Sequence, residues 1–170
     1  MEKRNVTVSA IVAAIVLIGD QLSKHWAETW LRTNGEYKIW DGVLHLRYVE
    51  NRGAAFGMMQ GGKWFFLAIT GIACAAMLYF LIKERKRLHF MMTFSIALLL
   101  SGAIGNLIDR VALGYVRDMI YVALIDFAVF NVADMAVTVG CCLLVLDLLF
   151  FKGKKYMEMM DKKPKTGENS

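Results

Sequence analysis

The sequence has few of the residues that disulfides and metal sites require. It contains three cysteines and three histidines among 170 residues. No CxxC spacing occurs, the histidines are scattered, and the cysteines fall within apolar segments, so neither a disulfide framework nor a metal site is indicated. The residues concerned are Cys74, Cys141, Cys142, His25, His45 and His89.

Four common enzyme motifs are also missing. The chain contains no GxSxG, no HExxH, no P-loop and no GxGxxG sequence. Each of these motifs carries a particular chemistry. Serine hydrolysis, zinc catalysis and nucleotide binding therefore have no support in this sequence.

Long apolar runs dominate what is present. Hydrophobic residues make up 57% of the chain, above the roughly 45–50% of soluble proteins. A helix needs about 20 residues to cross a bilayer, and the sequence predicts an all-α membrane protein with four transmembrane helices, at about residues 6–27, 64–82, 90–109 and 130–151. Residues 1–151 are predicted to form one membrane-embedded domain, followed by a disordered basic cytoplasmic tail at residues 152–170.

The net charge of +5 comes from basic clusters with a particular placement. They precede the first apolar block, separate the second from the third, and follow the fourth, at residues 2–4, 83–87 and 152–155. Four alternating helices would put all three on one side, where the positive-inside rule places both termini in the cytoplasm. This pattern is explained better by a membrane than by nucleic acid. A cleaved signal peptide over residues 1–30 is disfavoured, because no small-residue cleavage site follows its apolar core.

The segment between the first two apolar blocks has the features of a small β-sheet. Asp41-Gly42 lies between apolar stretches, which is a hairpin signal. Alternation over residues 44–49 is typical of a half-buried strand. We therefore expect a small extracytoplasmic sheet between helices one and two, with the glycine-bearing stretch 51–57 as a movable cover. The apolar stretch 112–130 is expected to lie along the membrane surface.

The polar residues of the predicted helices gather at one membrane level, the outer ends of the first, third and fourth spans. The inner halves hold almost nothing ionisable except Asp147. A pure scaffold would not need this segregation, and ionisable groups inside a membrane are functional candidates. The residues are Asp20 and Lys24 on the first span, Asn106, Asp109 and Arg110 on the third, and Asn131 and Asp134 on the fourth, with Asp118 nearby.

Spacing along each span puts these polar groups on shared helix faces. Asp20 and Lys24 are interpreted as an ion pair that either makes insertion tolerable or braces a site, because a paired aspartate is a poor acid. Gly102 and Gly105 would let a neighbouring helix approach the third span closely. Asn131 and Asp134, spaced i, i+3, share a helix face, and both must point inward, because lipid does not solvate polar side chains.

Paired carboxylates suggest aspartyl-type hydrolysis. Two close carboxyl groups share one proton, so one can activate a water while the other protonates the reacting carbonyl. A proton-coupled transporter and a binding or assembly module are alternatives. However, the polarity stops at one side of the membrane and no internal repeat is evident.

Five motifs, taken in order along the chain, resemble those of the bacterial lipoprotein signal peptidases, also called signal peptidase II. They are DQLSK (20–24), ENRGAAFG (50–57), GNLIDR (105–110), GYVRDMI (114–120) and FNVADM (130–135). The resemblance implies an intramembrane-type aspartyl endopeptidase that removes the signal peptide from diacylglyceryl-modified prolipoproteins by cleaving just before the lipidated cysteine. It implies no metal or organic cofactor, and inhibition by cyclic-peptide antibiotics such as globomycin. The expected location is the bacterial cytoplasmic (inner) membrane, with the active site near the outer face.

The same resemblance assigns roles to individual residues. The family's two catalytic aspartates match Asp118 and Asp134. Supporting positions match Asp20, Lys24, Asn106, Asp109, Arg110 and Asn131, and substrate or inhibitor binding is expected at Asn51, Arg52 and Gly53. Asp109 is the main rival of Asp118, although its polar neighbours suit an organising role. Asp126 is expected to face the surface.

Two residues beside Asp118 depart from the family pattern. Arg117 precedes it, where an apolar residue is common, and Met119 follows it, where phenylalanine is common. A cation so close would lower the pKa of Asp118 if it faced the same site. Arg117 is therefore expected to face lipid headgroups.

Overall fold

The computed structural model describes residues 2–53, 62–85, 87–151 and 153 of the chain. Most of the predicted basic tail and most of the predicted cover at 51–57 lie outside these residues. Four helices are long and apolar enough to cross a membrane, in agreement with the four predicted spans. Their bounds are α1 (Glu2–Trp26), α3 (Lys63–Glu84), α4 (Phe90–Ala112) and α5 (Val132–Phe150).

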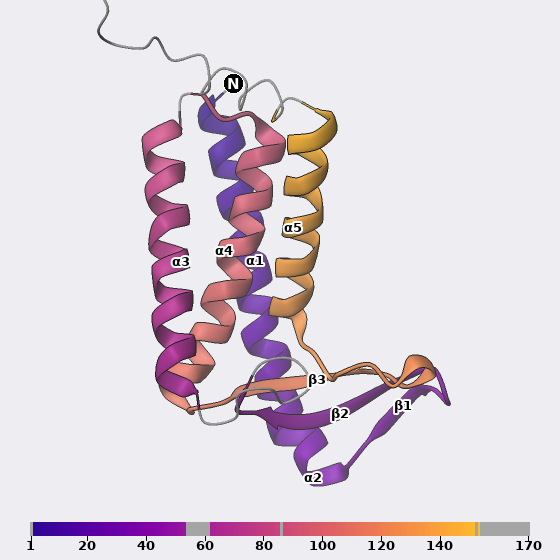
Figure 1. The fold of residues 1–170 in the computed structure, drawn as a ribbon. Coiled ribbons are helices and arrows are strands. Elements are labelled where there is room, and N and C mark those ends of the chain that lie inside the picture. The colour runs from indigo at the N-terminus through magenta and orange to yellow at the C-terminus, as the bar shows by residue number, and fades with distance from the viewer. Residues whose placement is uncertain (1, 54–61, 86, 152, 154–170) are drawn as a thin grey trace, which may run out of the picture.

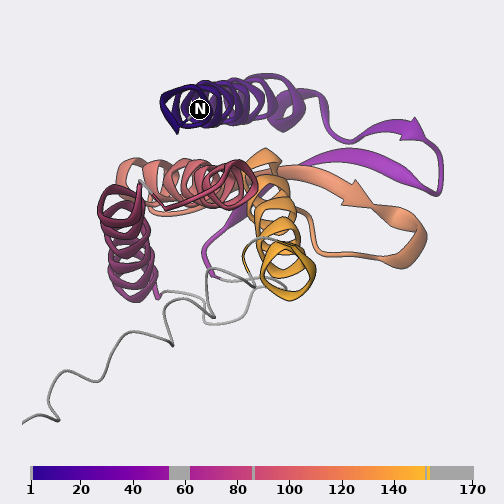
Figure 2. The same cartoon turned by 90° about the horizontal axis from the view of Figure 1, so that it is seen from above.

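Helix α4 is the centre of the bundle and contacts α1, α3 and α5 (Figures 1 and 2). In the most apolar stretch of α4, 61% of the residues are buried, whereas in that of α3 only 6% are. Its glycines have the predicted role, because a Cβ at Gly102 would lie 2.3 Å from the Ala133 carbonyl oxygen. One at Gly105 would lie 2.6 Å from an Asp20 carboxylate oxygen. Small residues thus bring α1 and α5 against α4.

A three-stranded antiparallel sheet, in the order β1-β2-β3, lies at one end of the bundle. The strands are β1 (Tyr37–Trp40), β2 (Leu44–Asn51) and β3 (Val116–Val122). The predicted hairpin at Asp41-Gly42 joins β1 to β2, with Gly42 at a φ of 72°. The third strand is not predicted from the sequence, because the sheet is expected to lie within the segment between the first two helices, whereas β3 follows α4 and pairs with β2.

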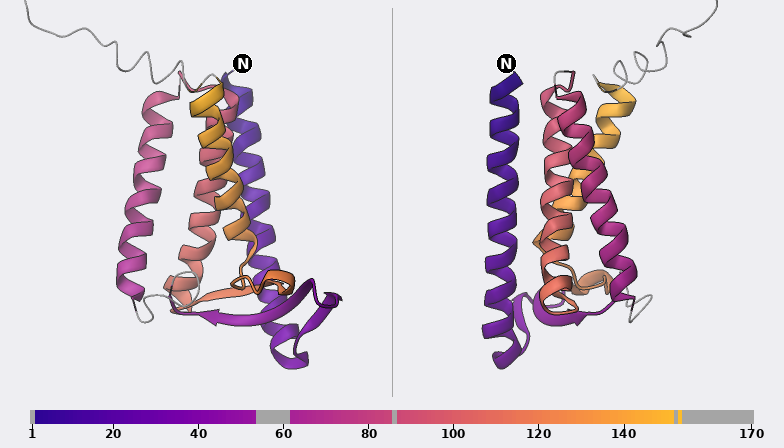
Figure 3. Two further views of the ribbon diagram at one scale, coloured as in Figure 1. Left: turned by 45° about the vertical axis from the view of Figure 1, so that its right-hand side comes forward. Right: turned by 90° about the vertical axis from the view of Figure 1, so that its left-hand side faces the viewer.

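The sheet is attached to the bundle through helical turns that continue α1. These are the π-helix η1 (Ala27–Leu31) and α2 (Arg32–Asn34). Ala27 and Leu31 are buried against Met119 of β3. The sheet extends sideways from one end of the bundle, whereas the start of α1 and the end of α5 lie at the other (Figures 1 and 3). We call these the sheet end and the terminal end.

The chain between β3 and α5 brings two parts of the site together. After the short turn η3 (Ala123–Ile125), the chain folds back so that Phe130 pairs with Ile120. Their backbone N–H groups and carbonyls exchange hydrogen bonds at 2.8 and 3.0 Å. This pairing delivers Asn131, the residue before α5, to the side of Asp118.

Candidate active site

Asp134 is fixed at the start of α5 by a capping box with Asn131. The Asn131 side-chain oxygen accepts a hydrogen bond from the Asp134 backbone N–H at 3.0 Å. An Asp134 carboxylate oxygen accepts one from the Asn131 backbone N–H at 3.1 Å. The pair satisfies backbone donors that a helix start otherwise leaves free. Asn131 is fully buried, so the inward orientation predicted from the i, i+3 spacing is confirmed for it.

Asp118 lies on β3 and is only 2% exposed. One of its carboxylate oxygens accepts a hydrogen bond from Asn131 Nδ2 at 2.6 Å, and the other from Asn51 Nδ2 at 3.0 Å. Asn51 reaches it because β2 pairs with β3 at this point. Burial and the charge of Asp134 raise the pKa of Asp118 to about 7, although the two amide donors act in the opposite direction.

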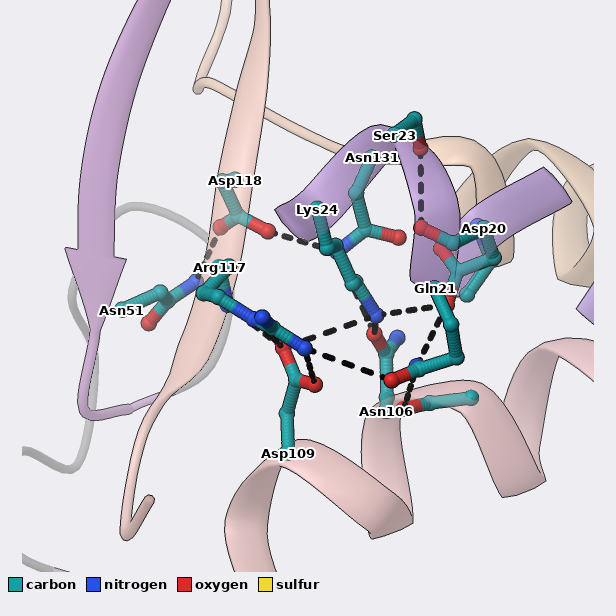
Figure 4. Close-up of polar contacts among 12 residues, drawn as sticks. Asp20, Gln21, Ser23, Lys24, Asn51, Asn106, Asp109, Arg117, Asp118 and Asn131 are labelled. Carbon is teal, nitrogen blue, oxygen red and sulfur yellow. Dashed lines mark hydrogen bonds and ion pairs between the residues drawn. The ribbon is translucent and has the colours of Figure 1, made fainter. Parts of the chain in front are cut away.

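Two asparagines join the two acids into one network, part of which is drawn in Figure 4. Asn106 on α4 donates a hydrogen bond to Asp134 at 2.7 Å, and its side-chain oxygen accepts one from Asn131 at 3.1 Å. Asn131 in turn donates to Asp118. Within the described part of the chain, neither Asp118 nor Asp134 forms an ion pair. Amide donors therefore hold both carboxylates without neutralising them.

The other two acids of the network are ion-paired. Lys24 Nζ lies 2.8 Å from an Asp20 oxygen and 3.8 Å from an Asp109 oxygen, and all three side chains are fully buried. The predicted Asp20–Lys24 pair is thus present. Asp20 also accepts the backbone N–H of Ala133 at 2.8 Å, and Lys24 donates to Asn106 at 2.9 Å. These contacts tie α1 to α4 and to the start of α5.

Arg117 does not face lipid headgroups, so that prediction is wrong. Its guanidinium donates to the two oxygens of Asp109 at 2.7 and 3.2 Å and to Glu28 at 2.9 Å, and Arg117 is only 9% exposed. Burial lowers its pKa, but the two acids more than offset this and hold the pKa above its usual value. Successive strand residues face opposite sides, so Arg117 pairs with Asp109 and forms no ion pair with Asp118.

Sequence reasoning missed two members of this network, Gln21 and Glu28. Gln21 donates to Asp20 at 3.1 Å and accepts from Arg117 at 3.2 Å (Figure 4). Glu28 follows Lys24 by four residues, just as Lys24 follows Asp20. That spacing places residues on one helix face and is the signal that would have found Glu28. Gln21 offers no comparable signal.

The three residues predicted to bind substrate or inhibitor do not act alike in the structure. Asn51 contacts Asp118, and its side-chain oxygen accepts the Gly53 backbone N–H at 3.0 Å. The Gly53 carbonyl accepts a hydrogen bond from Arg110 at 3.4 Å. Arg52 is exposed instead and lies 3.5 Å from a Glu50 oxygen. Asn51, Gly53 and Arg110 therefore border the two acids, and Arg52 does not.

A cavity of about 540 Å³ opens beside the two acids. Its polar side is formed by Asn51, Gly53, Asn106, Arg110, Asp118 and Asp134. Its remaining wall is almost entirely apolar and comprises Val116, residues 127–130, Met135 and residues 137–139. An apolar space with a few convergent polar groups is typical of a ligand site. No group of three or more His, Cys, Asp or Glu side chains among the described residues could hold a metal ion.

Known proteins match the chain over most of its length. A family model described as signal peptidase (SPase) II matches residues 12–150. A lipoprotein signal peptidase of Streptococcus thermophilus (strain CNRZ 1066) is 46% identical over 142 residues, covering 83% of this chain and 92% of that protein. One from Clostridioides difficile (strain 630) is 44% identical over 145 residues, covering 85% and 97% of the two chains.

Solved structures match the fold as well. A bacterial membrane enzyme determined at 2.3 Å has a TM-score of 0.78 and 34% identity, with 95% of both chains covered. A second, at 1.9 Å, has a TM-score of 0.76 and 35% identity, covering 85% of this chain and 94% of that one. The helical bundle with its small sheet is thus an architecture shared with bacterial membrane enzymes. By sequence and by fold, the chain belongs to the signal peptidase II family.

Proposed function

We propose that this protein is an aspartic endopeptidase that removes signal peptides from diacylglyceryl-modified prolipoproteins by cleaving just before the lipidated cysteine. Its relatives are lipoprotein signal peptidases, which supports this substrate class. One observation carries the assignment of the chemistry. Asp118 and Asp134, from different elements, are bridged by shared asparagines at the polar side of an apolar cavity.

The two carboxyl groups share one proton near neutral pH. The pKa of Asp118 is raised to about 7 by burial and by Asp134, so both groups do not ionise easily together. We assign the ionised role to Asp134, because it accepts N–H groups of Asn106 and Asn131 at the positive end of α5. Asp118 then carries the proton, and its two amide contacts fix where that proton is delivered.

Hydrolysis follows from this division of roles. Asp134 takes a proton from a water molecule, and the water oxygen attacks the carbonyl carbon of the scissile peptide bond. Asp118 donates its proton to the developing oxyanion. The proton held by Asp134 then passes to the leaving amine nitrogen as the C–N bond breaks, and Asp118 takes back a proton from a hydroxyl of the tetrahedral intermediate as the carbonyl re-forms. No charge has to leave the site, because each proton moves within the pair and its substrate.

The ion-paired residues position this machinery. Asp20 and Lys24 tie α1 to the start of α5 and to Asn106, which holds Asp134. Arg117 and Asp109 fix β3 against α4, which sets the position of Asp118. We propose that Arg110, which lines the cavity and donates to Gly53, helps to place the substrate backbone.

The apolar wall of the cavity suits the end of a signal peptide. Residues 127–130 and the α5 positions 135 and 137–139 offer it apolar contacts, and α5 is among the helices able to cross a membrane. A membrane-embedded substrate could therefore reach the acids without leaving an apolar environment. Cyclic-peptide antibiotics such as globomycin, expected from the family resemblance, would compete for the same cavity.

We further propose that the sheet end lies at the outer face of the bacterial cytoplasmic membrane and that both termini are cytoplasmic. Lys83 lies in the last turn of α3, and Arg85 and Arg87 lie between α3 and α4, at the terminal end of the bundle. The positive-inside rule places such basic clusters in the cytoplasm. Trp26 and Trp30 stack 5.6 Å apart near the sheet, as aromatic residues do at a membrane interface. Residues 1–151 would then act as one membrane-embedded domain.

Substitution of each acid tests the assignment. Asp118→Asn and Asp134→Asn keep the size of the side chain and remove its proton transfer, so each should lower cleavage of a lipidated prolipoprotein in detergent by roughly 10²–10⁴-fold. Asp41→Asn, at an exposed carboxylate on the hairpin, is the matched control and should cleave normally. Near-normal cleavage by a folded Asp118→Asn or Asp134→Asn protein would refute the assignment.

A further inference from the structure

A second cavity, of about 420 Å³, meets the first one at Asp118. Asn51, Asp118 and residues 127–129 line both spaces, so the acid lies at their junction. The second cavity has a different chemistry, because charged side chains of both signs line it. The residues that line it and not the first are Arg47, Val49, Glu50, Arg52, Tyr121 and Asp126. We call this second space the charged groove.

Three side chains of the charged groove form a connected row. The guanidinium of Arg47 lies 4.1 Å from the centre of the Tyr121 ring, and the Tyr121 hydroxyl donates to Asp126 at 2.6 Å. Asp126 has a left-handed φ of 47°, a conformation that aspartate tolerates better than most residues. This row therefore connects strands β2 and β3, which carry Arg47 and Tyr121, to the loop residue Asp126 on the other side of the groove.

Arg47 has a buried N–H group that no described residue accepts. Its Nε is buried and has no hydrogen-bond partner among the residues that the structure describes. A buried donor left without a partner is costly, and hydrogen bonds from a charged donor are among the stronger ones. Because Arg47 lines the charged groove, its guanidinium can donate to a ligand there that offers carbonyl oxygens.

We propose that the charged groove binds the peptide that follows the lipidated cysteine, with Arg47 donating hydrogen bonds to its backbone carbonyls. The inference rests on the proposed function. The scissile bond must lie at Asp118 and Asp134, and the apolar signal-peptide side fits the apolar cavity. The chain on the other side of the bond then continues into the space that meets this cavity at Asp118. Glu50 and Asp126 in the groove disfavour a phosphate headgroup, whereas a polar peptide tolerates both signs.

Two substrates of different length distinguish binding of the peptide beyond the cysteine from a general effect of Arg47 on activity. The first is a lipidated precursor that extends at least six residues beyond the cysteine, and the second ends at the cysteine as an amide. Arg47→Met keeps most of the side chain and removes its N–H groups. It should raise the KM of the long substrate by about tenfold and leave kcat/KM of the short substrate unchanged. In the wild-type protein, the short substrate should itself have the higher KM.

A control variant outside the groove and a second variant within it accompany Arg47→Met. Lys38→Met, which removes an exposed cation of β1, should change neither substrate. Equal losses on both substrates, as a headgroup contact or a folding defect would produce, would overturn the proposal. Tyr121→Phe provides a second variant, since it frees Asp126 and should weaken the long substrate alone. If the wild-type protein cleaves neither substrate, the proposed function fails, which is a different result from failure of the groove.

Discussion

Four aspartates share one polar network at the sheet end, and they divide into two pairs. Asp20 lies 2.8 Å from Lys24, and Asp109 lies 2.7 Å from Arg117. By contrast, the hydrogen bonds that the side chains of Asp118 and Asp134 accept come from asparagine N–H groups. A cation fixes an acid in its ionised form, whereas an amide fixes its position and leaves a proton free to move. We therefore propose that the ion-paired aspartates hold the structure and that the amide-held aspartates carry out the chemistry.

The separation is sharpest between two neighbours in the sequence. Arg117 and Asp118 are adjacent on β3, yet strand geometry turns them to opposite sides. The guanidinium of Arg117 donates to Asp109 and Glu28 and forms no ion pair with Asp118, its neighbour in the sequence. In a helix, two adjacent side chains do not point in opposite directions, so Arg117 and Asp118 would not be separated in this way. The strand conformation of β3 therefore has a direct role in the proposed chemistry.

The largest effect on stability should come from breaking an ion-paired acid. Arg117→Met leaves Asp109 buried beside a single, more distant cation, and losing one partner of a buried pair costs about 3–5 kcal/mol. Thermal unfolding in detergent should show a strongly lowered Tm. Lys38→Met, which breaks an exposed pair, should leave the Tm close to that of the wild type. An unchanged Tm for Arg117→Met would contradict the structural role of this pair.

A smaller effect should follow from changing one amide while keeping the helix cap. Asn131→Ser retains a side chain that caps helices well, but it removes the amide N–H that donates to Asp118, and its shorter hydroxyl does not reach as far. The Tm should therefore stay close to that of the wild type, while cleavage falls by roughly tenfold or more. Asn131→Ala also removes the cap and should in addition lose about 1 kcal/mol of stability. If Asn131→Ser cleaved normally, the amide would have no part in holding Asp118 for catalysis.

The amide-held pair should also show itself in the pH dependence of stability. An unfolded aspartate has a pKa of about 3.9, and that of Asp118 is raised to about 7 in the fold. Between these values the folded protein binds the extra proton, so wild-type stability falls as the pH rises toward about 7. Asp118→Asn lacks this loss, so its Tm relative to wild type should increase from about pH 5 to about pH 8.

An exposed acid provides the control for this pH effect. The pKa of Asp41 is lowered by its hydrogen bond and charge interaction with Lys38. Asp41→Asn should therefore show no increase in relative Tm over the same range. A parallel increase in both variants would mean that the effect does not arise from Asp118.

The smallest effect on cleavage should come from the acid at the terminal end. Asp147 is fully buried and lies 2.9 Å from His89 Nε2, but it lines neither of the two cavities. A buried acid without a cavity or a second acid has no route to the reaction. Folded Asp147→Asn protein should cleave the precursor at the wild-type rate. A selective loss of activity in this variant would show that a buried acid can be functional without lining either cavity.

The sequence predicts the parts of this molecule that depend on local spacing. The four spans follow from apolar length, the Asp41-Gly42 hairpin from its turn residues, and the inward orientation of Asn131 from i, i+3 spacing. Each of these features is decided within a few residues of the chain. Their observed counterparts are the four candidate spans, the β1–β2 turn and the capping box of α5.

What the sequence does not reveal depends on contacts between distant segments. Strand β3 forms because residues 116–122 pair with β2, about seventy residues earlier in the chain. Without that strand, the opposite directions of Arg117 and Asp118 have no visible cause, and Arg117 is misplaced at the headgroups. The donation from Asn51 to Asp118 is hidden for the same reason. The division of acids into two pairs is therefore a property of the tertiary fold.

The proton that we propose Asp118 and Asp134 share can be tested most directly by infrared spectroscopy of the carboxyl groups. In detergent, as the pH rises from about 5 to about 9, the wild-type protein should lose one protonated carboxyl band near pH 7. The same band should be absent from Asp118→Asn and present in folded Asp109→Asn. A band that persists in Asp118→Asn, or that disappears only in Asp109→Asn, would show that the ion-paired acids hold the proton and would contradict the account.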